Sequence, residues 1–192
     1  MCGVLGVFGL GSAVSLDDRA VERMRDLMAH RGPDGAGLWR CPWAVFAHRR
    51  LAVVAPGPEG AQPMVTPDGL HALVYNGELY NDAEIRRELM ARGVRFTTAS
   101  DTETVLKALA IWGESAIPRF RGMYAFGYAD VARRRVILAR DPLGIKPLYA
   151  ARVVTTDGPQ VVFASEPPAV LAHPAMRTEP DWVTAAAYLA SV

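Results

Sequence analysis

The sequence predicts an α+β domain in which antiparallel sheets carry stacked helices, and three observations lead to this class. Short β-like runs occupy the first part of the chain, two amphipathic helices follow in the middle, and the last third returns to β-like runs. Strands that are grouped apart from helices are typical of α+β domains, whereas strands and helices alternate in α/β domains. With 192 residues, of which 51% are hydrophobic, the chain is long enough to bury one sizeable core.

The first elements are expected to be a buried strand, a helix and a strand region. Residues 2–9, CGVLGVFG, form an apolar run typical of a buried strand. Residues 15–32 predict a helix with Ser15 as its N-cap, which Gly32 and Pro33 end. Its apolar face is expected to consist of Val21, Met24, Leu27 and Met28. Residues 37–54 predict one or two strands, and the Pro- and Gly-rich residues 55–63 predict a loop.

The middle of the chain predicts a strand followed by two capped helices. Residues 70–81 are expected to form a strand that runs into a turn at Asn76-Gly77. Helices are expected over 82–93, with Ile85 and Leu89 on one face, and over 101–113, with Val105, Leu109 and Trp112 on one face. The predicted N-terminal signals are Asn81 with Glu84 and the capping-box pair Ser100 with Glu103, and the predicted stops are Gly93 and Gly113.

The last third predicts four strands and two short helices. Turn residues separate the strands, which are expected within 122–130, 135–141, 146–154 and 160–166, and the helices are expected within 167–173 and 181–192. The basic run Arg133-Arg134-Arg135 is interpreted as a solvated hairpin turn.

Composition excludes several classes of function. The net charge is +1, with 21 Lys and Arg against 20 Asp and Glu, so nothing favours a nucleic-acid or membrane surface. The chain contains no apolar stretch long enough for a membrane span and no basic leader typical of a signal peptide. Two cysteines are too few for a disulfide framework, and we therefore expect a cytoplasmic protein. The histidines show no metal-ligand spacing, which predicts no metal in this part of the molecule.

Cys2 is the first candidate for chemistry. If Met1 is removed, Cys2 carries a free α-amino group, which titrates near neutral pH and can accept the proton of the adjacent thiol. Nucleophile and base would then belong to one residue. The alternative is that Cys2 only packs, as free cysteines commonly do, and Cys41 in a strand-like run is interpreted in that way.

Four other residues offer complementary groups, each with a structural alternative. Asn76 and Gly77 can supply two N–H donors to an oxyanion, although Asn-Gly is also typical of a turn. Arg50 can bind a carboxylate with its forked guanidinium, or can lie at the surface. Asp101 can bind a cation, or can complement the dipole of the helix that it opens.

The motifs in chain order resemble the class II glutamine amidotransferase domain, and among these the glutaminase half of asparagine synthetase and its relatives. The matching stretches are MCGVLGVFG, MAHRGPDGAG, AHRRLAVV, QPM, YNGELYN, SDTETVL, GMYAFGYAD, ARDPLGIKPLY and FASEPPAVLAHP. They cover nearly the whole chain. The resemblance implies a four-layer αββα sandwich of the N-terminal-nucleophile hydrolase type, with two antiparallel sheets between helical layers, and a single glutaminase domain over residues 1–192.

The resemblance also implies roles for named residues. It makes Cys2 the nucleophile that attacks the side-chain amide of glutamine, and Asn76 and Gly77 the oxyanion hole. Arg50 is expected to bind the α-carboxylate, Asp101 the α-amino group, and Glu78 the glutamine amide. Leu51 and Val53 belong to the segment LAVVAPGPEG, which is expected to close over glutamine. His30 and Arg31 are expected to be structural or to support that lid.

The implied reaction forms a γ-glutamyl thioester, releases ammonia and then hydrolyses the thioester to glutamate. Ammonia is expected to pass to an ATP-dependent synthetase domain, which would bind ATP and Mg²⁺; no cofactor is expected in residues 1–192. The synthetase motif SGGxDS is absent here, and residues 181–192 resemble the helix that leads into that domain. We therefore expect an excised domain, with a separate synthetase chain as the alternative, and a homodimer is one assembly that the resemblance allows.

Two other functions stay open at this point. One is a glutamine-binding regulatory or scaffolding module without significant turnover by itself. The other is an N-terminal-nucleophile amidohydrolase with a different acyl substrate, which the pair of Arg50 and Asp101, matched to the two charged ends of an amino acid, argues against.

Overall fold

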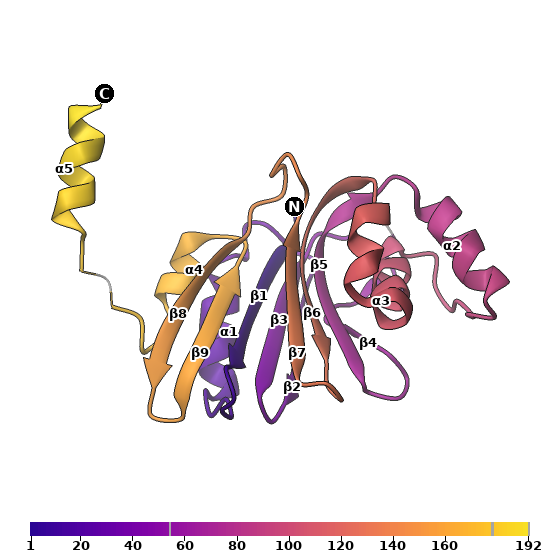
Figure 1. Ribbon diagram of the computed structural model, residues 1–192, viewed down its shortest axis with the longest axis horizontal. Helices are drawn as coiled ribbons and strands as arrows, with labels where there is room; N and C mark the ends of the chain where they lie inside the picture. The colour runs from indigo at the N-terminus through magenta and orange to yellow at the C-terminus, as the bar shows by residue number, and fades with distance from the viewer. Residues whose placement is uncertain (54, 178, 192) are drawn as a thin grey trace.

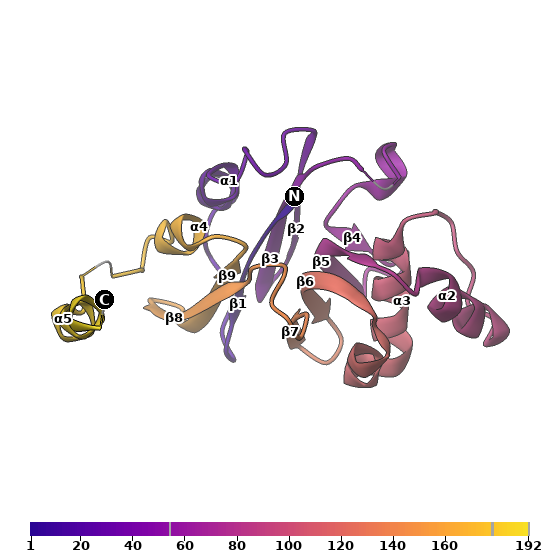
Figure 2. The ribbon, with the colours of Figure 1, turned by 90° about the horizontal axis from the view of Figure 1, so that it is seen from above.

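Two antiparallel β-sheets face each other at the centre of the computed structural model, which describes residues 1–53, 55–177 and 179–191 (Figure 1). The first sheet has the strand order β2-β3-β1-β9-β8, and the second has the order β4-β5-β6-β7. Viewed from above, helices α1 and α4 lie on one side of the strands and α2 and α3 on the other (Figure 2). The expected α+β class and the αββα layers are both confirmed.

The first sheet places the N-terminus at its centre. Strand β1 (Gly3–Gly9) pairs with β3 (Ala44–Arg50) on one side and with β9 (Gly158–Ala164) on the other. Outside them lie β2 (Gly35–Cys41) and β8 (Tyr149–Thr155). The region 37–54 therefore contains parts of two strands that form a hairpin. Because β1 is flanked on both sides, the residue just before it has a fixed position.

The second sheet consists of β4 (Met64–Val65), β5 (His71–Leu79), β6 (Gly122–Asp130) and β7 (Arg135–Arg140). Strands β5 and β6 pair over their full length, from His71–Asp130 to Leu79–Gly122. The predicted turn at Asn76-Gly77 is wrong, because both residues lie within β5, opposite Ala125 and Tyr124. Pairing with β6 along the whole of β5 outweighs the local preference of Asn-Gly for a turn. The predicted turn at the basic run is confirmed, since β6 and β7 are joined at Val131–Arg134.

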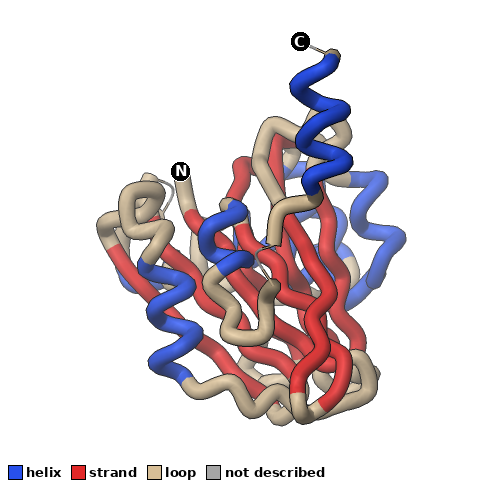
Figure 3. The backbone as a smooth tube through the Cα atoms, turned by 90° about the vertical axis from the view of Figure 1, so that its left-hand side faces the viewer, coloured by secondary structure: helices blue, strands red, loops and turns tan. Residues whose placement is uncertain are grey.

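Helices α1 (Asp18–Asp26) and α4 (Pro167–Leu171) cover the first sheet. Helix α3 (Asp101–Trp112) covers the second sheet, and α2 (Asp82–Ala91) packs against α3. Two 3₁₀ segments complete the regular structure, η1 (Pro58–Gly60) in the predicted loop and η2 (Gly113–Arg119) after α3. Helix α5 (Trp182–Ala190) stands apart from the strands in Figures 1 and 2, and in Figure 3, viewed from its end of the molecule, it lies in front of them. None of the helices in the described part of the chain has the length and apolar character needed to cross a bilayer.

Three apolar clusters hold the layers together. One lies between the first sheet and α1, and includes Val21, Met24 and Met28. A second lies between the second sheet and helices α2 and α3, and the third fills the space between the two sheets. The ring of Phe163 occupies this inter-sheet space, where a Cβ on Gly6 or Gly127 would approach it to 2.4 Å. Glycine on each sheet therefore makes room for the aromatic core.

Helices α1 and α2 differ from the prediction at two starts and one end. Asp17, rather than Ser15, caps α1 by accepting from Ala20 N at 2.7 Å, while Ser15 bonds to Asp157. Helix α1 also ends at Asp26, before Gly32, so Leu27 lies outside it and is 48% exposed. Asn81 lies at the predicted N-cap of α2, but its side chain bonds to Arg119 O and Arg121 N instead. The side chains of Ser15 and Asn81 bond to residues distant in the sequence and therefore do not cap the helices.

The start of α3 is only partly as predicted. Ser100 caps the helix by accepting from Thr102 N, but Glu103 does not return a bond to Ser100 as a capping box requires. The Glu103 carboxylate instead accepts from the backbone and hydroxyl groups of Thr97 and Thr98 and from Lys107 Nζ. It thereby ties the preceding loop to the first turn of α3. The apolar faces of α2 and α3 and the stops Gly93 and Gly113, both at positive φ, are confirmed. Val54 and Val192, which fall within predicted segments, lie outside the described residues.

Replacement Glu103→Gln is expected to lower the free energy of unfolding at neutral pH by about 1–3 kcal/mol, because a buried charged acceptor of several hydrogen bonds is lost. Burial opposes ionisation of Glu103, but Lys107 and the two threonines outweigh it and lower its pKa from 4.5 to about 2. A lowered folded-state pKa stabilises the protein above the unfolded pKa. The difference between wild type and variant should therefore shrink as pH falls from 4.5 towards 2.

Urea unfolding at neutral pH and at about pH 3 measures this difference. Glu84→Gln, in the first turn of α2 and exposed, is the matched control and should change stability by less than about 0.5 kcal/mol. Equal effects of the two variants would show that the Glu103 network does not stabilise the fold.

Candidate active site

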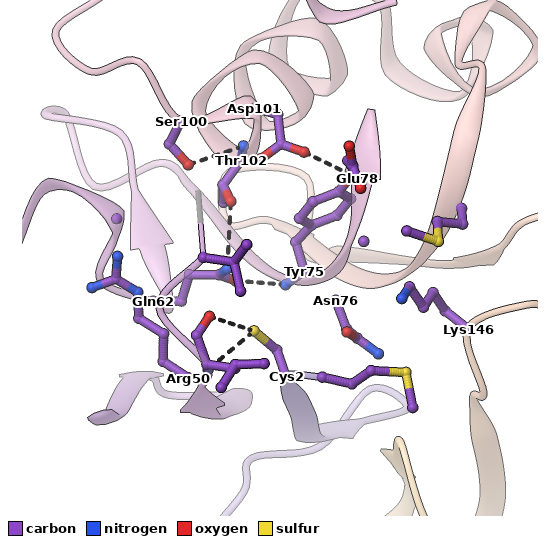
Figure 4. A pocket seen from close by; sticks show the side chains of 16 residues that line it. Cys2, Arg50, Gln62, Tyr75, Asn76, Glu78, Ser100, Asp101, Thr102 and Lys146 are labelled. Atoms are coloured by element: carbon purple, nitrogen blue, oxygen red, sulfur yellow. Dashed lines mark hydrogen bonds between the residues drawn. The ribbon is translucent and has the colours of Figure 1, made fainter. Parts of the chain in front are cut away.

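A cavity of about 230 Å³ lies where the N-terminus meets the facing sheet (Figure 4). Its lining contains every residue to which the sequence assigned a catalytic or glutamine-binding role: Cys2, Arg50, Leu51, Val53, Asn76, Gly77, Glu78 and Asp101. These residues come from the N-terminal segment before β1, from β3 and the loop after it, from β5 and from α3. The structure therefore brings together groups that lie up to about a hundred positions apart in the sequence.

The Cys2 thiol is half-buried and directly precedes the central strand β1. Leu51 N donates to the sulfur at 3.4 Å, and Sγ lies 3.7 Å from Leu51 O. The backbone of Leu51, just after β3, therefore fixes where the thiol points. Cys2 lines a cavity together with Arg50, Asn76 and Asp101, which favours a chemical role over the alternative that it only packs.

Arg31 is hydrogen-bonded to the N-terminal segment. Its Nε donates to Cys2 O at 3.0 Å, and its Nη1 donates to Glu166 Oε1 at 2.9 Å. His30 Nε2 lies 3.0 Å from the same carboxylate oxygen. The nitrogen of Met1 donates to Arg31 O at 3.1 Å. The expectation that His30 and Arg31 are structural fits these contacts, which position the backbone of Cys2.

Asn76 presents a buried donor at the cavity. The residue is 2% exposed, and its Nδ2 has no hydrogen-bond partner among the described residues. In Figure 4 its side chain lies beside Cys2 and Lys146. A buried amide N–H₂ without a partner is costly, so this atom is poised to donate to a ligand.

The N–H of Gly77 points towards the same open edge of β5. In an antiparallel strand, residues two apart direct their N–H groups to the same side. Tyr75 N donates to Gln62 Oε1 and Leu79 N donates to Asp101 Oδ2, both away from β6. The N–H of Gly77, which lies between them in β5, is therefore directed away from β6 as well.

Asp101 lies at the other end of the cavity, at the first position of α3. Its Oδ2 accepts from Leu79 N at 3.0 Å and from the Tyr75 hydroxyl at 3.2 Å. Burial raises the pKa of Asp101, while these two hydrogen bonds lower it in part. A buried carboxylate beside a cavity is suited to bind a cationic group.

Arg50 organises the segment that follows it. Its Nη1 donates to Gly57 O at 2.8 Å, and its Nη2 donates to Ala55 O. The guanidinium has five N–H donors, so others remain for a ligand in the cavity. Val53, in the same segment, is 73% exposed and borders the cavity. The expectation that this segment covers the cavity stays a prediction.

Several lining residues were not assigned a catalytic or glutamine-binding role from the sequence. They include Gln62, Tyr75, Ser100, Thr102, Met123 and Lys146. Gln62 bonds through Oε1 to Tyr75 N at 2.7 Å and through Nε2 to Thr102 Oγ1 at 3.4 Å. Lys146 is 8% exposed, and Figure 4 shows its amino group reaching into the cavity. The motifs QPM and ARDPLGIKPLY contained Gln62 and Lys146, but only tertiary contacts show that they meet the site.

Groups outside the cavity have structural roles. Cys41 is partly buried and packs against the inter-sheet cluster, as predicted. His48 is fully buried, which lowers its pKa to about 4, and its Nε2 donates to Tyr75 O at 3.2 Å. Within the ranges that the structure describes, His, Cys, Asp and Glu side chains form no cluster of three or more suited to a metal ion.

Comparison with known proteins identifies the family. The family model of the glutamine amidotransferase domain matches residues 1–192. The chain is 38% identical over 183 residues to asparagine synthetase [glutamine-hydrolyzing] 3 of Bacillus subtilis, which covers 94% of this chain and 29% of the relative. It is 39% identical over 150 residues to asparagine synthetase B [glutamine-hydrolyzing] of Escherichia coli, which covers 78% of this chain and 26% of the relative. The chain thus spans less than a third of these relatives.

Solved structures share the fold. A structure described as the allosteric regulatory enzyme of purine biosynthesis superposes with a TM-score of 0.72 at 24% identity, over 89% of this chain and 43% of that chain. The glutamine phosphoribosylpyrophosphate amidotransferase of Bacillus subtilis gives a TM-score of 0.66 at 24% identity, over 88% and 42%. The expected fold of the N-terminal-nucleophile hydrolase type is therefore confirmed.

Replacement Gly77→Ala is expected to lower the free energy of unfolding by about 1–3 kcal/mol, because the new methyl group overpacks the site. Its Cβ would lie 2.5 Å from Met123 O and 2.7 Å from the Tyr75 ring. Gly35→Ala is the matched strand control, since its Cβ would meet Arg50 Cβ at an ordinary 3.6 Å. Urea unfolding compares the two, and a Gly77→Ala protein as stable as the control would contradict the tight packing described here.

Proposed function

This chain belongs to the family of glutamine amidotransferase domains, and we propose that it hydrolyses the side-chain amide of L-glutamine through a thioester on Cys2. The observation that carries the proposal is the meeting of the Cys2 thiol with the unpartnered, buried Nδ2 of Asn76 in one cavity. Attack on an amide carbonyl needs a nucleophile and a hydrogen-bond donor that stabilises the developing oxyanion, and both are present here.

Two charged side chains of the cavity suit the two charged groups of an amino acid. Arg50 offers forked donors to the α-carboxylate, and Asp101 offers a buried carboxylate to the α-ammonium group. Leu51, Val53 and the exposed Glu78 also line the cavity, in which the side chain of glutamine would extend from its α-carbon towards Cys2 and Asn76. These assignments follow the family resemblance, and the lining of the cavity supports them.

The first chemical step begins once Met1 is removed, because the nitrogen of Cys2 is an amide while Met1 is attached. The free α-amino group of Cys2 takes the proton of its own thiol, and the thiolate attacks the carbonyl carbon of the glutamine amide. Asn76 Nδ2 and the N–H of Gly77 donate to the resulting oxyanion. The α-ammonium group of Cys2 then protonates the leaving nitrogen, the C–N bond breaks, and ammonia departs from a γ-glutamyl thioester.

The second step regenerates the thiol. A water molecule gives a proton to the α-amino group as its oxygen attacks the thioester, and the same oxyanion donors serve again. The C–S bond breaks, glutamate leaves, and the proton returns to sulfur. One residue therefore acts as nucleophile, base and acid in turn, while Arg31 keeps its backbone in place.

The whole protein is proposed to use the ammonia for an amidation of the asparagine synthetase kind. The relatives named as asparagine synthetases are more than three times as long as the stretch that this chain matches, which supports a synthetase domain in the same chain or in a separate subunit. That domain, rather than residues 1–192, would bind ATP and Mg²⁺. We also propose a cytoplasmic location, since both cysteines are free thiols and a reducing compartment keeps them so.

A glutamine-binding module without significant turnover is the second candidate. The presence of Arg50 and Asp101 in one cavity supports it, because a binding module needs the same two charged groups. The two functions differ in whether bound glutamine is hydrolysed.

Release of glutamate from glutamine by protein that begins at Cys2 tests the proposal, with the new N-terminus verified by mass spectrometry. Cys2→Ala is expected to reduce hydrolysis by at least about a thousandfold, because the nucleophile is lost. Cys41→Ala is the matched control and should retain activity, since Cys41 packs against the inter-sheet cluster outside the cavity.

Calorimetric titration of Cys2→Ser with glutamine then separates the candidates. Binding by the variant together with turnover by the wild type supports the glutaminase. Binding together with negligible turnover by the wild type with a free N-terminus would replace it with the binding module.

A further inference from the structure

Tyr75 connects the two ends of the cavity. Its N–H donates to Gln62 Oε1 at 2.7 Å, its carbonyl accepts from His48 at 3.2 Å, and its hydroxyl donates to Asp101 Oδ2 at 3.2 Å. We propose that Tyr75 is a positioning residue that aims the Asp101 carboxylate at the substrate's α-ammonium group and so sets a preference for amides that carry an α-amino group. The inference rests on the proposed glutaminase function.

The hydrogen bonds to Asp101 leave one carboxylate oxygen for a ligand. Leu79 N and the Tyr75 hydroxyl both donate to Oδ2, from the backbone and from a side chain of the same strand. Two donors on one oxygen fix the rotation of the carboxylate, and Oδ1 remains to receive an ammonium group. Burial raises the pKa of Tyr75 well above its ordinary value, so its hydroxyl keeps its proton and acts as the donor.

The Tyr75 ring cannot move away from this position at low cost. The residue is buried, and a Cβ on Gly77 would lie 2.7 Å from its Cζ and 2.8 Å from its hydroxyl oxygen. The ring therefore packs directly over the backbone of Gly77. In Figure 4 it extends from β5 towards Asp101 and Glu78. One side chain thus links the oxyanion donors to the group expected to bind the α-amino end.

Because other acidic groups surround Asp101, the Tyr75 hydroxyl helps to keep the Asp101 carboxylate ionised. On β5 the charged neighbour is Glu78, and on α2 it is Asp82, whose partner Arg86 also donates to Ser100 O at 2.8 Å. On α3 itself, Glu103 is paired with Lys107. Burial and the Asp82 charge raise the pKa of Asp101, and the Tyr75 hydroxyl lowers it. Removing the hydroxyl should therefore raise that pKa further.

Tyr75→Phe tests the inference, with Tyr128→Phe as the matched control. Tyr128 is an equally buried tyrosine on the adjacent strand, and its hydroxyl bonds to His71 Nδ1 at 2.7 Å, outside the cavity. Each variant keeps its ring and loses one hydroxyl. The measurements are kcat/KM for glutamine and for 4-carbamoylbutanoate, the same amide without the α-amino group, in each case with protein that begins at Cys2. If hydrolysis of 4-carbamoylbutanoate is too slow to measure, its inhibition constant in the glutamine assay is compared between the variants instead of its kcat/KM.

Tyr75→Phe is expected to lower kcat/KM for glutamine about tenfold and to change kcat/KM for 4-carbamoylbutanoate by no more than about twofold. The preference for glutamine, measured as the ratio of the two kcat/KM values, should therefore fall about tenfold. The acidic limb of the pH profile with glutamine should move to higher pH, because Asp101 then takes up its proton at higher pH. Tyr128→Phe should change neither. The ratio of the two substrates does not depend on the fraction of folded enzyme, so partial unfolding of a variant cannot imitate the result.

An active wild type whose Tyr75→Phe variant keeps the ratio and the acidic limb overturns this inference and leaves the glutaminase proposal intact. Equal changes in Tyr128→Phe overturn it as well. A wild type with a free Cys2 that hydrolyses neither amide overturns the glutaminase proposal and, with it, this inference.

Discussion

The position of Cys2 depends on the pairing of β1 in the middle of a sheet. A chain terminus is ordinarily the least ordered part of a domain. Here β3 and β9 flank β1 on both sides, and Arg31 bonds the carbonyl of Cys2 itself. Fixing the first residues in this way costs conformational entropy, which burial of Val4 and Leu5 in the two apolar clusters of the first sheet helps to offset. Without that pairing, a thiol at the terminus would have no defined direction.

The second requirement is that the two sheets keep their relative position. Cys2 directly precedes β1 of the first sheet, whereas Asn76 and Gly77 belong to the second. The inter-sheet cluster around Phe163, with Gly6 and Gly127 against its ring, sets the distance between them. His48 adds a polar link, because it lies on β3 and donates to the carbonyl of Tyr75 on β5. The site is thus a product of the packing between two sheets, and each sheet alone holds half of it.

Most of the fold and the main site residues could be predicted from the sequence, because they depend on local patterns and on motif order. Alternation, glycine stops and the order of the motifs located the strands, and the resemblance identified Cys2 and its expected partners. The predictions that are wrong concern residues whose conformation or hydrogen bonds depend on partners distant in the sequence. Asn76-Gly77 continues a strand because β6 pairs with it, and Asp17 rather than Ser15 caps α1 because Asp157 binds Ser15. Tyr75 and Gln62 were missed for the same reason, since their roles exist only through contacts between elements.

Covalent labelling tests the central claim most directly. The reagent is a glutamine analogue in which a chloroketone replaces the side-chain amide, and tryptic mass spectrometry locates the label on protein that begins at Cys2. The account predicts one label per chain, on the sulfur of Cys2, and protection by excess glutamine. Cys41 serves as an internal control, because it is a second free thiol outside the cavity. A label on Cys41 with Cys2 unmodified, or labelling of Cys2 that glutamine does not slow, would contradict the account.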